Sequence, residues 1–128
     1  MTKSMLLDKY PVFSYEIDKN ESKFNSVDEI LEFLKKKIEA DPSGAFIAIF
    51  DQLKHTKSLN GEVMEGLLSA KNIIYCFGVA ILNTKILAAR PRSIGVCELK
   101  NSFIIECMDA PREVMQGKIN SWIKELKI

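Results

Sequence analysis

The chain has one histidine, and a carboxylate precedes it closely in the sequence. Asp51 lies four residues before His55, just after an apolar stretch at 45–50. A histidine at a strand end near a carboxylate can act as a general base, or as a ligand to a metal or haem. Metal sites usually draw several His or Cys ligands, and no such cluster occurs here at a recognised spacing. An exposed loop histidine without a chemical role is the alternative, and the sequence leaves both open.

Two arginines flank a proline later in the chain. Arg90 and Arg92 surround Pro91 and can present two guanidinium groups from one loop. Such a pair is suited to a carboxylate or a phosphate, because each guanidinium offers a planar fork of donors. The alternative is ordinary surface ion pairing with acids such as Glu98 or Glu106, which contributes little free energy.

Three cysteines, Cys76, Cys97 and Cys107, occur without CxxC or CxC spacing. An odd number without such spacing predicts reduced, mostly buried thiols rather than a disulfide framework or a metal site. Cys97 is the candidate reactive thiol, since a reactive cysteine needs exposure and a positive neighbour. The sequence predicts no metal site and no cofactor.

Composition and charge exclude several function classes. The chain has 128 residues, is 47% hydrophobic and 27% charged, and carries a net charge of +1. These values predict a single folded domain over residues 1–128, with 1–10 as a loosely held N-terminal arm. The charge balance gives no field to attract nucleic acid, and no apolar run approaches the length of a membrane span. We therefore expect a cytoplasmic protein with neither nucleic acid nor a membrane as its partner.

The elements that must position these residues follow from periodicity and end signals. Ser26 and Glu29 form a capping-box pattern, and Asp109 with Pro111 marks the start of a last helix. Gly78 marks a bulge or a close backbone approach. The predicted elements are a strand at 12–17, a helix from Ser26, a strand at 45–50, a helix at 62–70, a strand at 73–80, an ambiguous segment at 86–89, a hairpin of 94–99 and 102–108, and a helix at 112–127. The order β-α-β-α-β-(β)-β-β-α predicts an α+β fold: a mostly antiparallel sheet of four to five strands with helices on one face.

The hairpin is the clearest structural signal. A two-residue turn at Lys100-Asn101 predicts that Cys97 faces Ile104 across the strands. The residues that share the helix-covered face are then Ile94, Val96, Phe103, Ile105 and Cys107. Cys97, Ile104 and Met108 fall on the other face, so Cys97 and Cys107 cannot bond to each other in this register.

The second face of the sheet is too apolar for open solvent. The strands at 45–50 and 73–80 are apolar on both sides, whereas an antiparallel sheet with helices on one face normally shows polar residues on the other. We therefore expect a homodimer, in which a second subunit covers this face.

The C-terminal half of the chain resembles that of the small DUF302-like α+β domains. The matching features are an apolar strand ending in Phe77-Gly78, a polar turn, a proline-marked segment, and a hairpin that leads through Asp109-Ala110-Pro111 to a final helix. Three residues separate Asp51 from His55, whereas the family pattern brings them together, so no role for His55 carries over. The resemblance implies a compact, often self-associating α+β fold, and no settled activity.

Two hypotheses for function follow. The first is a non-catalytic, self-associating protein that binds a small anionic ligand or a protein partner, with Arg90, Arg92, His55 and Asp51 as the ligand-binding residues. The second is a redox, cofactor-binding or metal-binding protein that uses His55 and a thiol such as Cys97. The sequence favours the first and leaves catalysis undecided.

Overall fold

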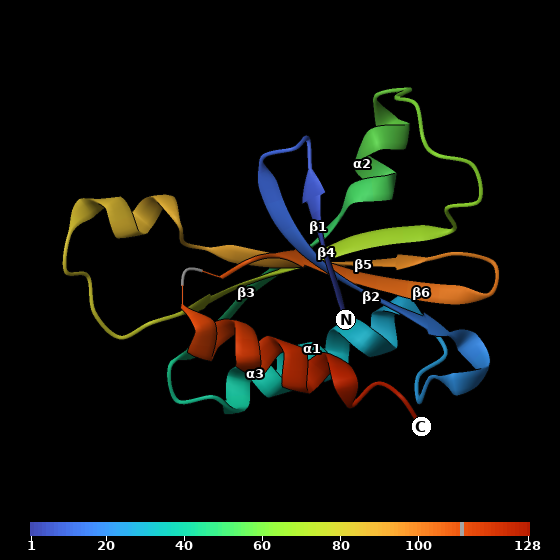
Figure 1. The fold of residues 1–128 in the computed structure, drawn as a ribbon. Coiled ribbons are helices and arrows are strands. Elements are labelled where there is room, and N and C mark those ends of the chain that lie inside the picture. The colour runs from blue at the N-terminus through green and yellow to red at the C-terminus, as the bar shows by residue number, and fades with distance from the viewer. Residues whose placement is uncertain (111) are drawn as a thin grey trace.

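The computed structural model describes residues 1–110 and 112–128, and an antiparallel sheet forms its centre (Figure 1). The described part of the sheet has six strands in the order β1-β2-β6-β5-β4-β3. The strands are β1 (Thr2–Leu6), β2 (Tyr10–Asp18), β3 (Gly44–Asp51), β4 (Ser69–Phe77), β5 (Arg92–Glu98) and β6 (Ser102–Met108). Strand β3 lies at one edge and carries a register shift between Phe46 and Ala48. The predicted α+β class is confirmed.

Two helices cover one face of the sheet, as predicted. Figure 1 shows α1 (Val27–Ala40) and α3 (Glu113–Lys124) on the same side of the strands. Helix α1 begins where the capping box predicts, because the Ser26 hydroxyl accepts from the Glu29 amide at 3.1 Å. The Glu29 carboxylate reaches back one residue further than a standard capping box and accepts from the Asn25 amide at 2.9 Å. The side chains that form the core between helices and sheet include Ile17, Ile30, Leu34, Ile38, Ile73, Ile94, Val96, Phe103, Ile105, Ile119 and Ile123.

The hairpin of β5 and β6 has the predicted register. Cys97 pairs with Ile104 and Val96 with Ile105. The Leu99 amide donates to the Ser102 carbonyl at 2.9 Å, which closes the two-residue turn. Cys97 therefore lies on the face that α1 and α3 leave open, and Cys107 is buried beneath the helices.

The predicted helix at 62–70 is wrong. The second helix, α2 (Gln52–Ser58), comes earlier, directly after β3, and the Asp51 carboxylate caps it by accepting from the Lys54 amide at 2.9 Å. The apolar residues at 62–70 suggested helical spacing, but Gly66 adopts a positive φ of 87° and β4 already begins at Ser69. Met64 and Leu68 stay exposed, so this segment has no buried helical face.

Other boundaries also differ from the predictions. The N-terminal arm at 1–10 contributes the edge strand β1, which raises the strand count from the predicted four to five to six. The segment at 86–89 belongs to a short 3-10 helix, η2 (Thr84–Ala88). Strand β4 ends at Phe77 rather than Ala80, because Gly78 has a φ of 136°. Arg112 occupies the N-cap position of α3 in place of Asp109, and the predicted role of Pro111 in the first turn lies outside the described residues.

No helix in the described ranges is long and apolar enough to cross a membrane.

Candidate functional site

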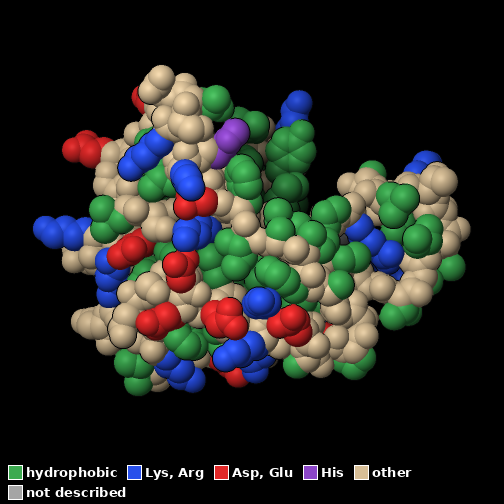
Figure 2. All heavy atoms as spheres, turned by 180° about the vertical axis from the view of Figure 1, so that it is seen from behind, with side chains coloured by type: hydrophobic (Ala, Val, Ile, Leu, Met, Phe, Trp, Pro, Cys, Tyr) green, Lys and Arg blue, Asp and Glu red, His purple; other side chains and the backbone are tan. Residues whose placement is uncertain are grey.

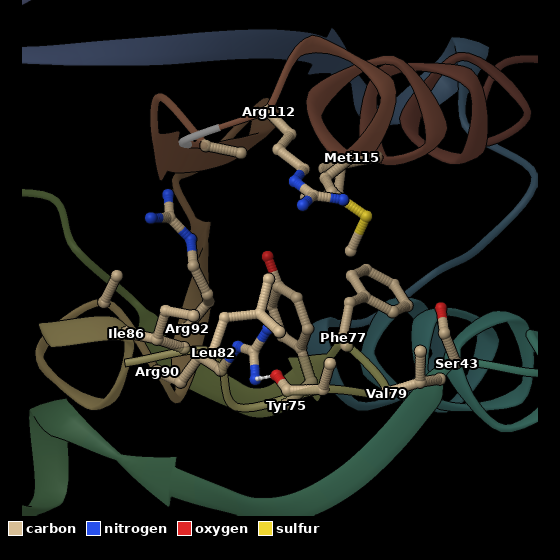
Figure 3. Close-up of a pocket in the computed structure, with 15 residues that line it drawn as sticks. Ser43, Tyr75, Phe77, Val79, Leu82, Ile86, Arg90, Arg92, Arg112 and Met115 are labelled. Atoms are coloured by element: carbon tan, nitrogen blue, oxygen red, sulfur yellow. Dashed lines mark hydrogen bonds between the residues drawn. The ribbon is translucent and has the colours of Figure 1, made fainter. Parts of the chain in front are cut away.

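A pocket opens between the sheet, the start of α3 and a loop that projects from the body of the protein. We call residues 78–90 the pocket loop. It connects β4 to β5 and contains η2, and it stands apart from the body in Figures 1 and 2. The pocket has a volume of about 350 Å³, within the range of small-molecule sites, roughly 300–1,000 Å³. The lining residues are Ser43, Tyr75, Phe77, Gly78, Val79, Ala80, Leu82, Ile86, Ala89, Arg90, Arg92, Ala110, Arg112, Met115 and Ile119 (Figure 3).

The two ends of the pocket loop are fastened to each other. The Arg90 guanidinium lies against Gly78 and donates from Nη1 to the Ala80 carbonyl at 2.9 Å (dashed in Figure 3). The Gly78 amide donates to the Ser43 carbonyl at 3.1 Å. A Cβ at residue 78 would collide with the Arg90 guanidinium, and few side chains tolerate the φ of this residue. The predicted close approach at Gly78 therefore exists, although an arginine side chain makes it.

Tyr75 supplies an unpartnered polar atom to the pocket. Its side chain is 1% exposed, and its hydroxyl has no hydrogen-bond partner within the described part of the chain. In Figure 3 the hydroxyl points into the space between Arg92 and Arg112. Burial raises the pKa of Tyr75 to about 12; Cys107 adds to the rise, and the nearby Arg92 guanidinium opposes it. Tyr75 is therefore a hydrogen-bond donor at neutral pH, and its proton has no acceptor among the described residues.

Arginine is concentrated in this pocket. The chain has three arginines and fifteen lysines. All three arginines line the pocket, and no lysine does so in the described structure. Arg92 donates from Nη2 to the carbonyl oxygens of Met108 and Asp109, at 2.7 and 2.9 Å, and the rest of its guanidinium remains available to the pocket.

The predicted alternative of surface ion pairs for the arginines is not found among the residues that the structure describes. Glu98 accepts from Lys19 at 2.6 Å, and Glu106 accepts from the Ser14 hydroxyl at 2.6 Å. All the ion pairs found among the described residues use lysine as the cation. The charges of the three arginines are therefore not neutralised by these acids and remain available to a ligand in the pocket.

A buried amide holds the segment that leads from β6 into α3. Gln116 accepts from the Ala110 amide at 3.0 Å through Oε1, and donates through Nε2 to Asn120 at 2.9 Å. Nε2 also lies 3.5 Å from the Cys107 sulfur. Because Gln116 is buried and its hydrogen bonds are made, it fixes Ala110 and so the pocket rim from which Arg112 extends.

The structure brings together only part of the predicted site. Arg90 and Arg92 line the same pocket, whereas His55 and Asp51 do not. Asp51 caps α2, and the exposed His55 on that helix lies against Phe50, with ring centroids 5.4 Å apart. Cys97 is half-buried on the open face of β5, where burial and then Glu106 raise its pKa, which disfavours a thiolate. No group of three or more His, Cys, Asp or Glu residues able to hold a metal exists in the parts of the chain described.

Sequence reasoning missed Tyr75 and Arg112. Tyr75 sits inside an apolar strand, and nothing in its neighbourhood distinguishes it from a packing residue. The sequence did mark Arg112, because arginine is much rarer than lysine in this chain. Arg112 also directly follows a proline, as Arg92 does. The use of arginine where lysine would suffice for solubility indicates a need for a planar fork of donors.

Comparison with known proteins agrees with this fold and leaves the ligand open. No curated protein matches the chain. The crystal structure of an uncharacterized conserved protein DUF302 from Bacillus stearothermophilus is similar, with a TM-score of 0.55 and 17% identity over 89% of this chain and 86% of that chain. This likeness confirms the DUF302-like fold. A family model described as "Family of unknown function (DUF6858)" matches residues 1–128, and the chain therefore belongs to the DUF6858 family.

Proposed function

We propose that this protein is a non-catalytic receptor for a small anion-bearing ligand, which binds in the pocket between β4, β5, α3 and the pocket loop. The observation that carries the proposal is the distribution of cations: every arginine of the chain lines this one pocket, while all fifteen lysines lie elsewhere in the described structure. Arginine forks bind carboxylates and related oxyanions in a bidentate manner, which a lysine ammonium cannot do.

The electrostatic surroundings support an anionic ligand. The lining contains no aspartate or glutamate among the residues that the structure describes. Residues 66–97, which include β4, the pocket loop and the start of β5, contain no acidic residue at all. Because no carboxylate lines the pocket among these residues, the three guanidinium groups give it a net positive field that favours an anion over a cation.

An NMR titration tests the proposal. Benzoate, a small anion with an apolar ring, is added to the ¹⁵N-labelled full chain. We expect the largest shifts at the backbone amides of Phe77, Gly78 and Ala110, and none at His55. Arg112→Gln should weaken binding by about tenfold or more, because it removes a charge-assisted hydrogen bond. Lys85→Gln is the matched control: it removes a positive charge from the pocket loop outside the lining and should change the affinity less than twofold. Equal losses in both variants, or shifts centred on His55, would contradict the proposal.

Self-association through the open face of the sheet is part of the same proposal. Ile74, Cys97 and Ile104 are only half-buried there, and Met108 is exposed, which supports a second copy as the covering layer. Sedimentation equilibrium tests it. We expect a dimer at micromolar concentration and a monomer for Ile104→Glu, which places a charge at the centre of this face. A wild-type protein that is strictly monomeric in this range excludes the dimer.

The free state of all three cysteines supports a reducing compartment such as the cytoplasm. A redox role for His55 and Cys97 has less support, because the thiol is held in its protonated form.

A further inference from the structure

The pocket has two chemically different ends, which narrows the class of ligand beyond an anion. Tyr75, Arg92 and Arg112 surround one end. Apolar side chains form most of the remaining lining, with Phe77 and Met115 from the body and Val79, Leu82 and Ile86 from the pocket loop; Met115 lies beside Arg112, and the Arg90 guanidinium among them is turned to Ala80 (Figure 3). A ligand that fits both ends must be amphiphilic.

The side chains of the polar end offer mainly donors, with the Tyr75 oxygen as the one atom that can also accept. The Tyr75 hydroxyl has a proton to give, and a guanidinium has no acceptor atom. The Arg92 guanidinium already satisfies two backbone carbonyls with one of its nitrogens and can still offer the others. This excess of donors favours a ligand head rich in acceptors, as an ionised oxyacid is.

The donor set fits a carboxylate better than a phosphate. Phosphate sites typically combine cations with free backbone amides from a glycine-rich loop or a helix start. Here the nearby Ala110 amide is engaged by Gln116, and the first turn of α3 carries Glu113, which repels a dianion. Arg90 turns its guanidinium to Gly78 and Ala80, which leaves Arg92, Arg112 and Tyr75 for a compact planar head.

The pocket loop exposes the apolar surface that the body of such a ligand would cover. Val79 is 89% and Leu82 79% exposed, although both line the pocket. Figure 2 shows the pocket loop held away from the body, with a hollow between them. Covering exposed apolar side chains is favourable in proportion to the area removed from water.

We propose, building on the receptor function above, that the ligand is an amphiphilic monocarboxylate. Its carboxylate lies against Tyr75, Arg92 and Arg112, and its aliphatic or aromatic body lies beneath the pocket loop against Leu82 and Ile86.

Calorimetric titration of the full chain with a homologous series tests the ligand class. The probes are acetate, butyrate, hexanoate and octanoate, with octyl phosphate and octanol as head-group controls. We expect roughly fourfold tighter binding for each methylene added, as burial of a methylene predicts. Octanoate should bind more tightly than octyl phosphate, and octanol at least tenfold more weakly. The fluorescence of Trp122 gives a second readout, because its ring lies 5.6 Å from that of Phe77 in the pocket lining.

Variants at the two ends test the orientation. Tyr75→Phe should weaken every carboxylate by a similar factor of about ten or more, since it removes a hydrogen bond to a charged head. Leu82→Asn should weaken octanoate several-fold and leave acetate unchanged. Leu87→Asn is its matched control, an exposed leucine of the pocket loop that does not line the pocket, and it should change neither affinity.

The failures of the two proposals are distinguishable. Tighter binding of octyl phosphate, or an affinity that does not change with chain length, overturns the monocarboxylate class and leaves the anion receptor intact. Failure of all the anions to bind, or equal binding of octanol and octanoate, overturns both.

Discussion

Replacement of Tyr75 by phenylalanine should make the ligand-free protein more stable and a poorer receptor. The hydroxyl has less than 1 Å² of exposed surface and no partner within the described residues, so it loses its hydration on folding without compensation. A buried, unsatisfied polar group costs about 1–3 kcal/mol. The Tyr75→Phe substitution removes that cost and keeps the ring, which packs edge-on against Phe77 at 5.3 Å. We expect a gain of about 1–2 kcal/mol in the free energy of unfolding.

Urea denaturation followed by circular dichroism measures this gain. For a chain of this length it corresponds to a rise in Tm of roughly 3–8 °C. Tyr15→Phe is the matched control: Tyr15 is half-buried on β2, and its substitution should change the free energy of unfolding by less than about 0.5 kcal/mol. Saturating octanoate should remove most of this difference, because only the wild type gains the head-group hydrogen bond and a tenfold higher affinity stabilises it by about 1.4 kcal/mol. A Tyr75→Phe protein that is less stable than the wild type without ligand would refute the reasoning, since it would mean that the hydroxyl is satisfied within the folded chain.

Three further predictions concern the same region and the core. The pKa of Tyr75 is raised from its ordinary value near 10 to about 12, so the unfolded chain loses this proton first as the pH rises. The wild type should therefore lose about 2 kcal/mol of stability relative to Tyr75→Phe between pH 10 and 12, measured by urea denaturation, and parallel pH profiles would contradict it. Gly78→Ala should lower the free energy of unfolding by about 1–3 kcal/mol and displace the pocket loop. Gly117→Ala is the control: this helical site is exposed, with open space where the Cβ would lie, and the substitution should raise the free energy of unfolding by about 0.5–1 kcal/mol. Thermal melts in which the two variants shift alike would contradict the strain at residue 78. Leu34→Ala in the fully buried face of α1 should cost about 2–5 kcal/mol in urea denaturation, and a loss below about 1 kcal/mol would contradict its place in the core.

Local signals in the sequence predicted much of the fold. The Ser26 cap, the strand at 12–17 and the two-residue turn at Lys100-Asn101 each depend on neighbouring residues, and each proved correct. The misplaced second helix shows the limit of such signals. The apolar residues at 62–70 matched a helical period, but a period alone cannot show whether a helix there would have a surface to pack against. The helix formed instead in the more polar segment at 52–58, where Asp51 caps its first turn.

The site was predictable only where its residues are close in sequence. Arg90 and Arg92 come from one loop, and the proline between them was a visible marker. Tyr75 and Arg112 reach the pocket from β4 and the start of α3, so only the folded chain places them beside Arg92. The pairing of Tyr75 with Arg92 across β4 and β5 depends on a strand register that the sequence alone did not define.

The register shift in β3 has a consequence for behaviour at high concentration. Residues 45–50, AFIAIF, are uncharged, free of proline and rich in strand-forming side chains, the composition of segments that build amyloid fibrils. They lie in a strand at the edge of the sheet, where an incoming strand could pair with them. The irregularity between Phe46 and Ala48 interrupts the ladder that such a strand would need. Deletion of Ile47, which would restore a regular edge, should therefore turn a well-behaved protein into one that forms thioflavin-positive fibrils.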